Sequence, residues 1–220
     1  MSSGFHIAVF AKAPIVGEVK TRLIPLLGKE GAAAAHRKMT WHALNIARTA
    51  AAGNVSLWTA GQHNHPFLRD CSARVGAPIR PQCDGDLGVR MADCFHHLLP
   101  LHAHVLLIGS DCPVLSVLDL RNAAAALTLQ RQMVFTPAED GGYVLVGMRQ
   151  RSADRHPYLG DAAFKEIDWG TANVMQQTRT RLQAVGWQQQ RDWAELPTCW
   201  DVDTPDDYRR ALREELIADS

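Results

Sequence analysis

The sequence predicts an α/β three-layer sandwich with a mostly parallel central sheet and helices on both faces. Short apolar runs such as Phe5–Ala11 and Val105–Ile108 alternate with longer stretches in which apolar residues recur every three or four positions. Strands and helices that alternate in this way pack as a parallel sheet covered by helices. The 220 residues, of which 46% are hydrophobic and 21% charged, suffice for one full core, so we expect a single domain over residues 1–220.

The individual elements are predicted from local signals in chain order. Residues 5–11 and 55–59 are expected as strands, and the helical spacing of apolar residues predicts a helix over 28–52 between them. Residues 61–81 are expected to hold a short helix and a short strand. Further strands are expected at residues 105–108, 133–136 and 143–148, and further helices at residues 88–99, 115–130, 171–185 and 205–217.

Two of these helices are preceded by a side chain that suits an N-cap. Asp86 and Thr204 each stand before an expected helix, where a side-chain oxygen can accept a hydrogen bond from a free backbone N–H, and the helix over 115–130 is expected to start near Ser116. Pro205 suits the first turn of its helix, because the missing N–H has no partner there in any case. These caps fix where the helices begin.

Charge and cysteine content exclude several classes of protein. Lys+Arg and Asp+Glu both number 23, so the formal net charge is zero and no nucleic-acid-binding tail is indicated. Five cysteines without a Cys-x-x-Cys pair fit a reducing compartment better than a disulfide framework. No apolar run is long enough to span a membrane, and the first residues do not resemble a signal peptide. We therefore expect a cytoplasmic protein that binds neither nucleic acid nor membrane.

A basic loop follows the first expected strand. Ala11 ends that strand, and Lys12, Gly17, Lys20 and Arg22 follow within a few positions. Ligands of open α/β sheets bind beyond the carboxyl ends of the strands, and lysine and arginine are the usual partners of phosphate there. The loop is therefore a candidate nucleotide-binding segment, with Lys20 and Arg22 as candidate catalytic cations. A solvated basic loop is the alternative.

A second candidate segment is the glycine-rich turn that leads into the helix over 88–99. It contains Gly85, Asp86, Gly88 and Arg90, and its glycines allow the backbone to approach a ligand closely. In the functional interpretation this turn lies against the base or the sugar of a nucleotide. A plain helix start explains the same residues equally well.

Two acidic segments are candidate metal ligands. Ser110 and Asp111 directly follow the strand over 105–108, and magnesium favours one or two carboxylates together with water and substrate phosphates. Further along, Asp201 and Asp203 alternate across a short extended piece, so we expect them to point to opposite sides, with Asp203 facing the site. Helix capping is the alternative role for Asp111 and for Asp203.

A possible general base lies in the turn between two expected strands. Glu139 and Asp140 precede two glycines, and either carboxylate could accept a proton from an incoming hydroxyl group. Asp140 is the candidate we place first. A purely structural turn accounts for the same sequence.

Several other features carry less weight. Pairs of histidines are not expected to bind metal, because a histidine site needs three or four converging ligands; they are His63 with His65, His96 with His97, and His102 with His104. Trp169 and Trp200 lie near polar turns and are candidates to line an acceptor pocket. Cys112 is not expected to act as a nucleophile, since no histidine partner is evident.

The ordered set of motifs resembles a known family. The motifs are Lys-Thr-Arg-Leu, Gly-Asp-Leu-Gly-x-Arg-Met, Gly-Ser-Asp-x-Pro, Asp-Gly-Gly-Tyr and Asp-Val-Asp-Thr-Pro-x-Asp. Together they look like the DUF2064-type branch of bacterial nucleotide-diphospho-sugar transferases. The resemblance covers about residues 5–212 and implies a GT-A fold, similar to that of the guanylyltransferases of cofactor biosynthesis. It also implies a nucleotide on the first loop and a divalent metal, Mg²⁺ or Mn²⁺, on Asp111 and Asp203.

The residues and the resemblance together predict a metal-dependent transferase with a nucleotide-sugar or nucleoside triphosphate donor and a small-molecule acceptor. In glycosyl transfer, which we place first, an acceptor hydroxyl attacks the sugar carbon, with Asp140 or Glu139 as base. In nucleotidyl transfer an acceptor phosphate attacks the α-phosphorus and pyrophosphate leaves. The lone aspartate in Ser110-Asp111-Cys112, where many GT-A glycosyltransferases have Asp-x-Asp, favours this second reaction. A nucleotide-binding protein without turnover is the third alternative.

Overall fold

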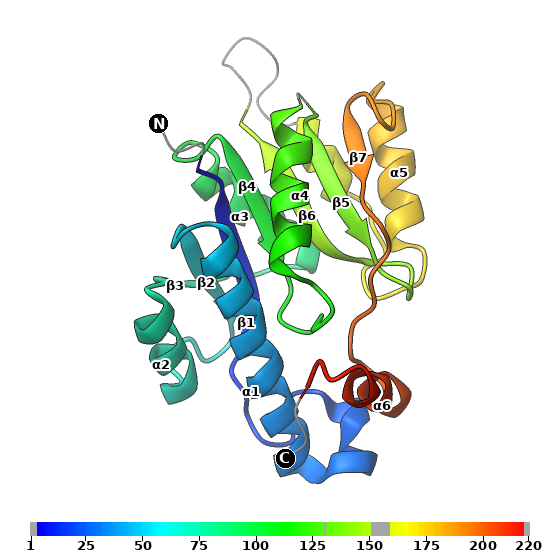
Figure 1. Ribbon diagram of the computed structural model, residues 1–220. Helices are drawn as coiled ribbons and strands as arrows, with labels where there is room; N and C mark the ends of the chain where they lie inside the picture. Colours follow the sequence, from blue (N-terminus) through cyan, green and yellow to red (C-terminus); the bar gives the residue numbers. More distant parts are fainter. Residues whose placement is uncertain (1–3, 130, 151–158, 218–220) are drawn as a thin grey trace.

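The computed structural model describes residues 4–129, 131–150 and 159–217, and within these ranges seven strands form one sheet (Figure 1). The strand order is β3-β2-β1-β4-β6-β5-β7. Only β6 runs antiparallel to its neighbours, β4 and β5, so the predicted mostly parallel α/β sheet is confirmed. The strands are β1 (His6–Lys12), β2 (Val55–Ala60), β3 (Ile79–Pro81), β4 (His104–Ile108), β5 (Met133–Pro137), β6 (Tyr143–Arg149) and β7 (Trp193–Glu195).

Every predicted helix is present, with ends that differ by a few residues. The helices are α1 (Ile24–Ala50), α2 (Pro66–Val75), α3 (Leu87–Leu98), α4 (Val117–Thr128), α5 (Val174–Ala184) and α6 (Pro205–Arg213), with short 3₁₀ segments η1 (Thr21–Leu23) and η2 (Leu159–Phe164). A break at Gly28, where φ is 69°, separates the first turn of α1 from the rest. Asp86 and Thr204 cap α3 and α6 as predicted, and Ser116, near which a helix start was expected, caps α4. Residue 130, the predicted end of α4, lies outside the described ranges.

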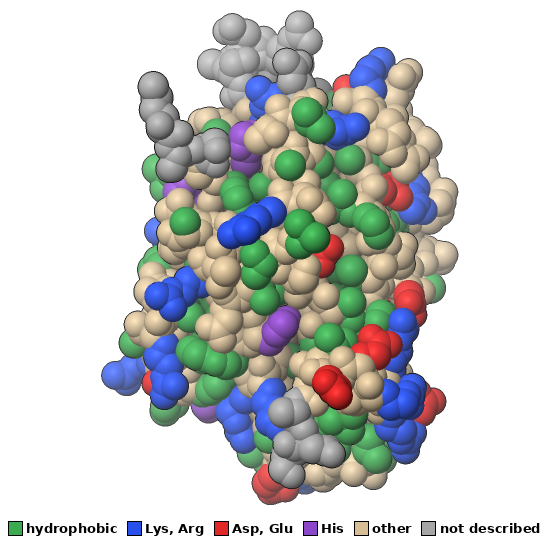
Figure 2. Space-filling view, in the orientation of Figure 1, with side chains coloured by type: hydrophobic (Ala, Val, Ile, Leu, Met, Phe, Trp, Pro, Cys, Tyr) green, Lys and Arg blue, Asp and Glu red, His purple; other side chains and the backbone are tan. Residues whose placement is uncertain are grey.

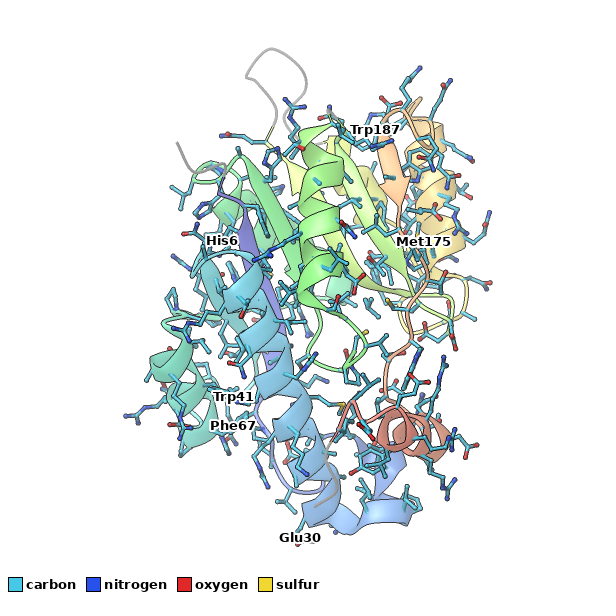
Figure 3. All side chains as sticks on the ribbon, viewed as in Figure 1. His6, Glu30, Trp41, Phe67, Met175 and Trp187 are labelled. Atoms are coloured by element: carbon cyan, nitrogen blue, oxygen red, sulfur yellow. The ribbon has the colours of Figure 1, made fainter. Side chains whose placement is uncertain are left out.

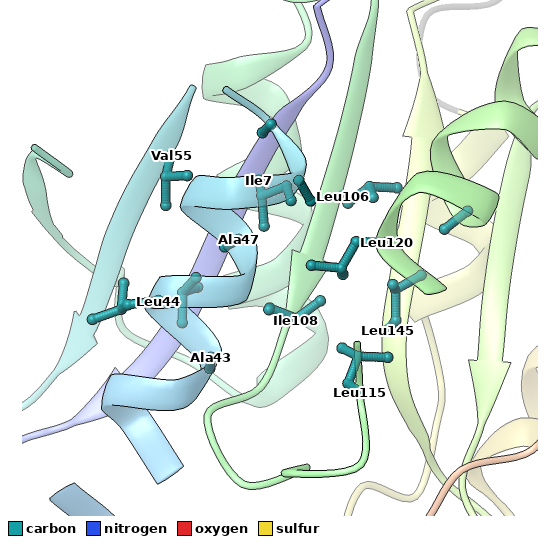
Figure 4. Close-up of a cluster of buried hydrophobic side chains, with 14 of the residues drawn as sticks. Ile7, Ala43, Leu44, Ala47, Val55, Leu106, Ile108, Leu115, Leu120 and Leu145 are labelled. Carbon is teal, nitrogen blue, oxygen red and sulfur yellow. The ribbon is translucent and has the colours of Figure 1, made fainter. Parts of the chain in front are cut away.

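Helices α1, α2 and α4 cover one face of the sheet. Figure 4 shows the part of this core beneath α1 and α4. Leu44 and Leu120 meet Ile7, Leu106 and Ile108 of the central strands there, and all five side chains are fully buried. Apolar area removed from water at such positions is the main stabilising term of the fold, at roughly 1.5–3 kcal/mol for each large side chain. Because β1 and β4 lie in the middle of this core, the loops at their ends have a rigid base.

Helices α3 and α5, with η2, cover the opposite face. Phe95 of α3 stacks on Phe164 of η2, with ring centroids 6.0 Å apart. Met175 lies on the side of α5 that faces the sheet (Figure 3) and packs in the same core as Trp193 of β7. Strand β7 is not predictable from the sequence, because three residues give no periodic signal.

A third apolar cluster joins α6 to the first half of α1. Leu23, Ala35 and Met39 pack against Val202 and Tyr208. This contact places the segment before α6 beside the basic loop that follows β1, although the two lie far apart in sequence (Figure 1). Acidic and basic side chains intermingle on the outer surface around α6 (Figure 2).

None of the helices in the described ranges is both long enough and apolar enough to cross a bilayer.

Candidate functional site

A cavity of about 600 Å³ lies at the carboxyl ends of β1 and β4. β6 contributes its amino end to the same edge, because it runs antiparallel to β4. The walls come from the basic loop, from α3, from the loop after β4, from the turn before β6, from residues 169–174, and from the segment that precedes α6. This is the edge of an α/β sheet at which ligands bind.

Lys20 is the central cation of the cavity. Its side chain is only 8% exposed, and its Nζ lies 2.7 Å from Oδ1 of Asp203 and 3.3 Å from Oδ2 of Asp111. Its backbone is left-handed, with φ 44°, a conformation that a non-glycine residue adopts at some cost. Burial alone would lower the pKa of Lys20, but the attraction of Asp111 and Asp203 outweighs it and the pKa lies above its usual value. Lys20 is therefore held charged between two carboxylates.

The loop after β4 is shaped to present Asp111. A Cβ atom on Gly109 would lie 2.7 Å from Oδ1 of Asp111, so a larger residue at position 109 would displace the Asp111 carboxylate. Burial favours the neutral acid, but Lys20 more than compensates, and the pKa of Asp111 lies below its usual value. The backbone oxygen of Asp111 accepts a hydrogen bond from the N–H of Val202 at 3.0 Å. That bond fixes the loop against the segment that carries Asp203.

Asp203 is oriented by the start of α6. The side chain of Asp207 accepts hydrogen bonds from the N–H groups of Asp203, at 3.2 Å, and Thr204, at 2.7 Å, while Thr204 caps the helix in return. Asp203 is therefore not the cap of α6. Its second oxygen lies 3.7 Å from Nη1 of Arg22, whose side chain is 74% exposed and free to reorient.

Asp201 also faces the cavity, so the prediction that Asp201 and Asp203 point to opposite sides is wrong. Strict alternation requires a strand, and residues 201–203 are irregular, with the intervening Val202 fully buried. Asp111, Asp201 and Asp203 each place an oxygen within 4.8 Å of the others. Burial, with repulsion from Asp111 and Asp203, raises the pKa of Asp201 to about 7.

This donor set fits a hard divalent cation. Magnesium and manganese prefer carboxylate oxygens and keep positions for water or phosphate, and the Asp111 and Asp203 side chains are 41% and 43% exposed to the cavity. Within the described ranges, the three aspartates are the one group of acidic, histidine or cysteine side chains that converges in this way. None of the histidine pairs joins such a group.

Of the other predicted nucleotide-binding residues, some line the cavity and others do not. Those that line it are Ala11, Lys12, Arg90 and Ser110. Those that lie outside its lining are Gly17, Gly85, Asp86 and Gly88. Gly88 has a packing reason instead, because a Cβ there would lie 2.5 Å from the Phe164 carbonyl oxygen and 2.9 Å from the Trp169 indole nitrogen. Asp86 caps α3 through the N–H of Val89 at 2.9 Å.

The two candidate bases differ in where they point. Asp140 lines the cavity and accepts a hydrogen bond from the N–H of Gly142 at 2.9 Å. Glu139 is directed away to α6, where its Oε2 lies 3.0 Å from Nη1 of Arg210. Asp140 therefore remains a candidate base, whereas Glu139 anchors the turn to α6.

His36 is a cavity residue that was not predicted from the sequence. This α1 residue is 5% exposed and lines the cavity. Its Nε2 lies 3.0 Å from the carbonyl oxygen of Lys12, so Nε2 carries the proton and donates it. Burial lowers the pKa of His36 and keeps the ring neutral. A histidine on the alanine-rich face of a helix was the available signal, but it is shared by many core histidines.

The two tryptophans named as candidates have different positions. Trp169 lines the cavity, and its ring meets that of Tyr143 edge-on at 6.3 Å. Trp200 instead belongs to the cluster between α1 and α6, where Arg210 lies 4.2 Å above its ring. The prediction for Trp200 is therefore wrong, because packing on α6 turns it away from the cavity.

Comparison with known proteins identifies the family. A model described as an uncharacterized protein conserved in bacteria (DUF2064) matches residues 43–171. The chain belongs to the DUF2064 family. The match includes Asp111 and Asp140 but not Lys20 or Asp203, which the fold brings to the same cavity. No curated protein matches the sequence at a significant level.

Solved structures share the fold. A protein of Desulfovibrio desulfuricans G20, assigned provisionally as a nucleotide-diphospho-sugar transferase, is 29% identical, with a TM-score of 0.75 over 93% of this chain and 84% of that one. CMP:2-keto-3-deoxy-manno-octonic acid synthetase in complex with CTP is 13% identical, with a TM-score of 0.57 over 97% and 100%. A Mycobacterium tuberculosis H37Rv protein in complex with manganese is 18% identical, with a TM-score of 0.52 over 96% and 98%.

Proposed function

We propose that this protein is a metal-dependent transferase that uses a nucleotide-sugar or a nucleoside triphosphate, with glycosyl transfer as the first assignment. One observation carries the proposal: Lys20 is held between Asp111 and Asp203 beside Lys12 and Arg22 in one open cavity. Cations and carboxylates side by side suit a ligand that is a polyphosphate bound with a divalent metal. The 29% identity to a provisional nucleotide-diphospho-sugar transferase supports the class of donor.

Each group of residues in the site has a separate proposed role. Asp111 and Asp203, with Asp201 next to them, would hold Mg²⁺ or Mn²⁺, which when bound neutralises negative charge on the donor phosphates. Lys12 and Arg22 bind phosphate oxygens, and Lys20 stabilises the charge that develops on the leaving group. Ser110, Arg90 and the backbone at Ala11 remain candidates for contacts with the nucleotide.

The reaction type depends on which acceptor group attacks the donor, a hydroxyl or a phosphate. For glycosyl transfer Asp140 takes the proton of the acceptor hydroxyl, and its place on the cavity wall supports this role. For nucleotidyl transfer an acceptor phosphate is already ionised and needs no base. The single aspartate after β4 favours this alternative, as does the fold shared with the CTP-bound synthetase. Both reactions use Lys20 and Asp111 in the same way.

A thermal-shift panel tests the proposal. Nucleoside triphosphates and nucleotide-sugars are added with and without Mg²⁺ or Mn²⁺, and the preferred donor should raise stability only with metal. At a hundredfold excess over its dissociation constant a ligand stabilises by roughly 2.7 kcal/mol. Asp111→Asn should abolish the metal-dependent shift, while Asp70→Asn, at a carboxylate paired with Arg74 on the surface of α2, should retain it. A panel in which no donor stabilises the wild-type protein would refute the proposal.

Product analysis separates the two reactions and the non-catalytic alternative. Release of a nucleoside diphosphate from a nucleotide-sugar indicates glycosyl transfer, and release of pyrophosphate from a triphosphate indicates nucleotidyl transfer. Asp140→Asn should slow the first reaction and leave the second nearly unchanged. Tight metal-dependent donor binding without release of either product, over a broad set of acceptors, would favour the non-catalytic protein.

A further inference from the structure

Two cysteines lie side by side behind the carboxylate cluster and have no part in the proposed reaction. Cys112 directly follows Asp111 and is 6% exposed, whereas Cys199 is only partly buried. The Sγ of Cys112 lies 3.2 Å from the carbonyl oxygen of Trp200, the residue next to Cys199. The two thiols are also within hydrogen-bonding reach of each other.

Backbone hydrogen bonds hold the two segments that carry these cysteines. The N–H of Val202 donates to the Asp111 oxygen at 3.0 Å, and the N–H of Cys199 donates to the Pro137 oxygen at 2.9 Å. Cys199 further packs against the apolar core that contains Cys112. The thiols therefore meet because two well-anchored segments meet, and not because of a flexible surface loop.

The remaining cysteines provide a contrast. Cys71 and Cys94 are fully buried in α2 and α3, on opposite faces of the sheet, and Cys83 lies in the turn before α3. No contact between two thiols is seen for these three within the described ranges. A pair of adjacent thiols with one accessible member is the arrangement that closes a disulfide after oxidation.

We propose that Cys112 and Cys199 form a thiol-oxidation site that takes a hydroperoxide and closes an intramolecular disulfide next to the carboxylate cluster. The sulfur of Cys199, the accessible thiol, attacks a peroxide oxygen; the O–O bond breaks, one water leaves, and Cys199 becomes a sulfenic acid. The sulfur of Cys112 then attacks the Cys199 sulfur, the S–O bond breaks, and a second water leaves. Two thiols are oxidised to one disulfide, and one hydrogen peroxide is reduced to two waters.

The disulfide acts on the site through the chain on either side of it. A sulfur–sulfur bond of about 2.05 Å is shorter than any non-bonded contact between two sulfurs, so the disulfide ties the loop that carries Asp111 covalently to the segment that carries Asp201. Both carboxylates belong to the cluster at the cavity. Oxidation therefore restricts the relative motion of the two segments that carry these acidic side chains, and a thiol reductant reverses the restriction.

Peptide mapping of the wild-type protein tests the proposal without any variant. The reduced protein is treated with hydrogen peroxide, free thiols are blocked with N-ethylmaleimide, and the protein is digested without reductant. The expected product is one linked peptide pair containing Cys112 and Cys199, an intact mass lower by two hydrogen atoms, and reversal by dithiothreitol. Peroxide-treated protein that retains both thiols, or that carries an irreversible sulfinic acid on Cys199, overturns the proposal.

Matched variants assign the order of the steps. Cys112→Ser should trap a sulfenic acid on Cys199 that dimedone labels, Cys199→Ser should leave Cys112 unoxidised, and Cys83→Ser should form the disulfide as the wild type does. Dimedone labelling at Cys112 in Cys199→Ser reverses the proposed order and overturns it. Neither readout depends on a nucleotide, so failure here is distinct from failure of the proposed transferase.

Discussion

Polar clusters lie at both ends of strand β1. The cluster at the carboxyl end contains charged side chains, whereas the cluster at the amino end is neutral. Beyond the carboxyl end, Lys20 is 8% exposed yet remains charged, because Asp111 and Asp203 touch it. His6 lies at the amino end (Figure 3) and is 7% exposed. Its ring bonds to the Ser56 hydroxyl at 2.8 Å and stacks on His102 at 4.4 Å. Burial, with repulsion from His102 and Arg80, lowers the pKa of His6 to about 4.

The difference shows what permits charge near the core of this fold. Desolvation penalises a buried charge at both ends of the strand, and only opposite charges in contact can offset it. The cluster at the cavity has those partners and stays open to a ligand. The His6 cluster lacks them, so it is neutral and serves packing.

The largest expected effect is that of Lys20→Ala. Transfer should fall by about 10²–10³-fold, as when a charge-stabilising donor is removed from an active site. At the same time the thermal shift caused by Mn²⁺ alone should grow, because Lys20 no longer competes for Asp111 and Asp203. Lys165→Ala, a change at an exposed lysine outside the cavity, should alter neither quantity. A smaller Mn²⁺ shift in Lys20→Ala would show that Lys20 and the metal do not share these carboxylates.

Lowering the pH should reduce the folding stability that depends on the neutral His6 cluster at the amino end of β1. His6 has a folded pKa of about 4, below its ordinary value of 6.5, so the unfolded chain binds the proton first. Its contribution to stability is therefore complete above pH 6.5 and is lost as pH falls toward 4, by up to about 3 kcal/mol. His6→Gln should remove this part of the pH dependence in urea unfolding. Parallel pH profiles for wild type and variant would contradict the burial argument.

Asp201 tests whether nearby cations fully balance the negative charge of the carboxylate cluster. Its folded pKa of about 7 exceeds the ordinary 3.8, so the folded state prefers the acid form and its stability falls as pH rises from about 4 to 7. Without metal, Asp201→Asn should stabilise the protein at pH 8 by about 1–2 kcal/mol, an effect that fades as pH falls from 7 toward 4. Asp203→Asn, which removes a partner of Lys20, should destabilise instead. Equal effects of the two changes would contradict their different surroundings.

The smallest effect concerns the helix that supports Asp203. Thr204→Ala and Ser116→Ala each remove a capping box, and each should cost about 1 kcal/mol in unfolding free energy. Only Thr204→Ala should also weaken the metal-dependent thermal shift, because Asp207 holds both the cap and the backbone of Asp203. Identical metal responses in the two variants would mean that the cap does not position the site.

Much of the fold was predictable because its signals are local. The caps at Asp86, Ser116 and Thr204, and the position of Asp111 after a buried strand, follow from patterns of a few residues. The spacing of Asp201 and Asp203 gave a wrong prediction, because side chains alternate between opposite sides only in a strand. Contacts with Asp111 and α6 determine the conformation of this irregular segment instead. Contacts between distant segments, such as those of Glu139 with Arg210 or His36 with Lys12, leave no local pattern and had to come from the structure.

The cavity is formed by residues that are synthesised at different stages of translation. β7, the last strand of the sheet, ends at Glu195, whereas Asp201 and Asp203 follow it. During translation every strand of the described sheet, together with Lys20 and Asp111, is therefore synthesised before Asp201 and Asp203. A message cut short after residue 199 would encode every strand and no complete acidic cluster. The order of synthesis thus delays any activity of this cavity until the sheet that supports it has been made.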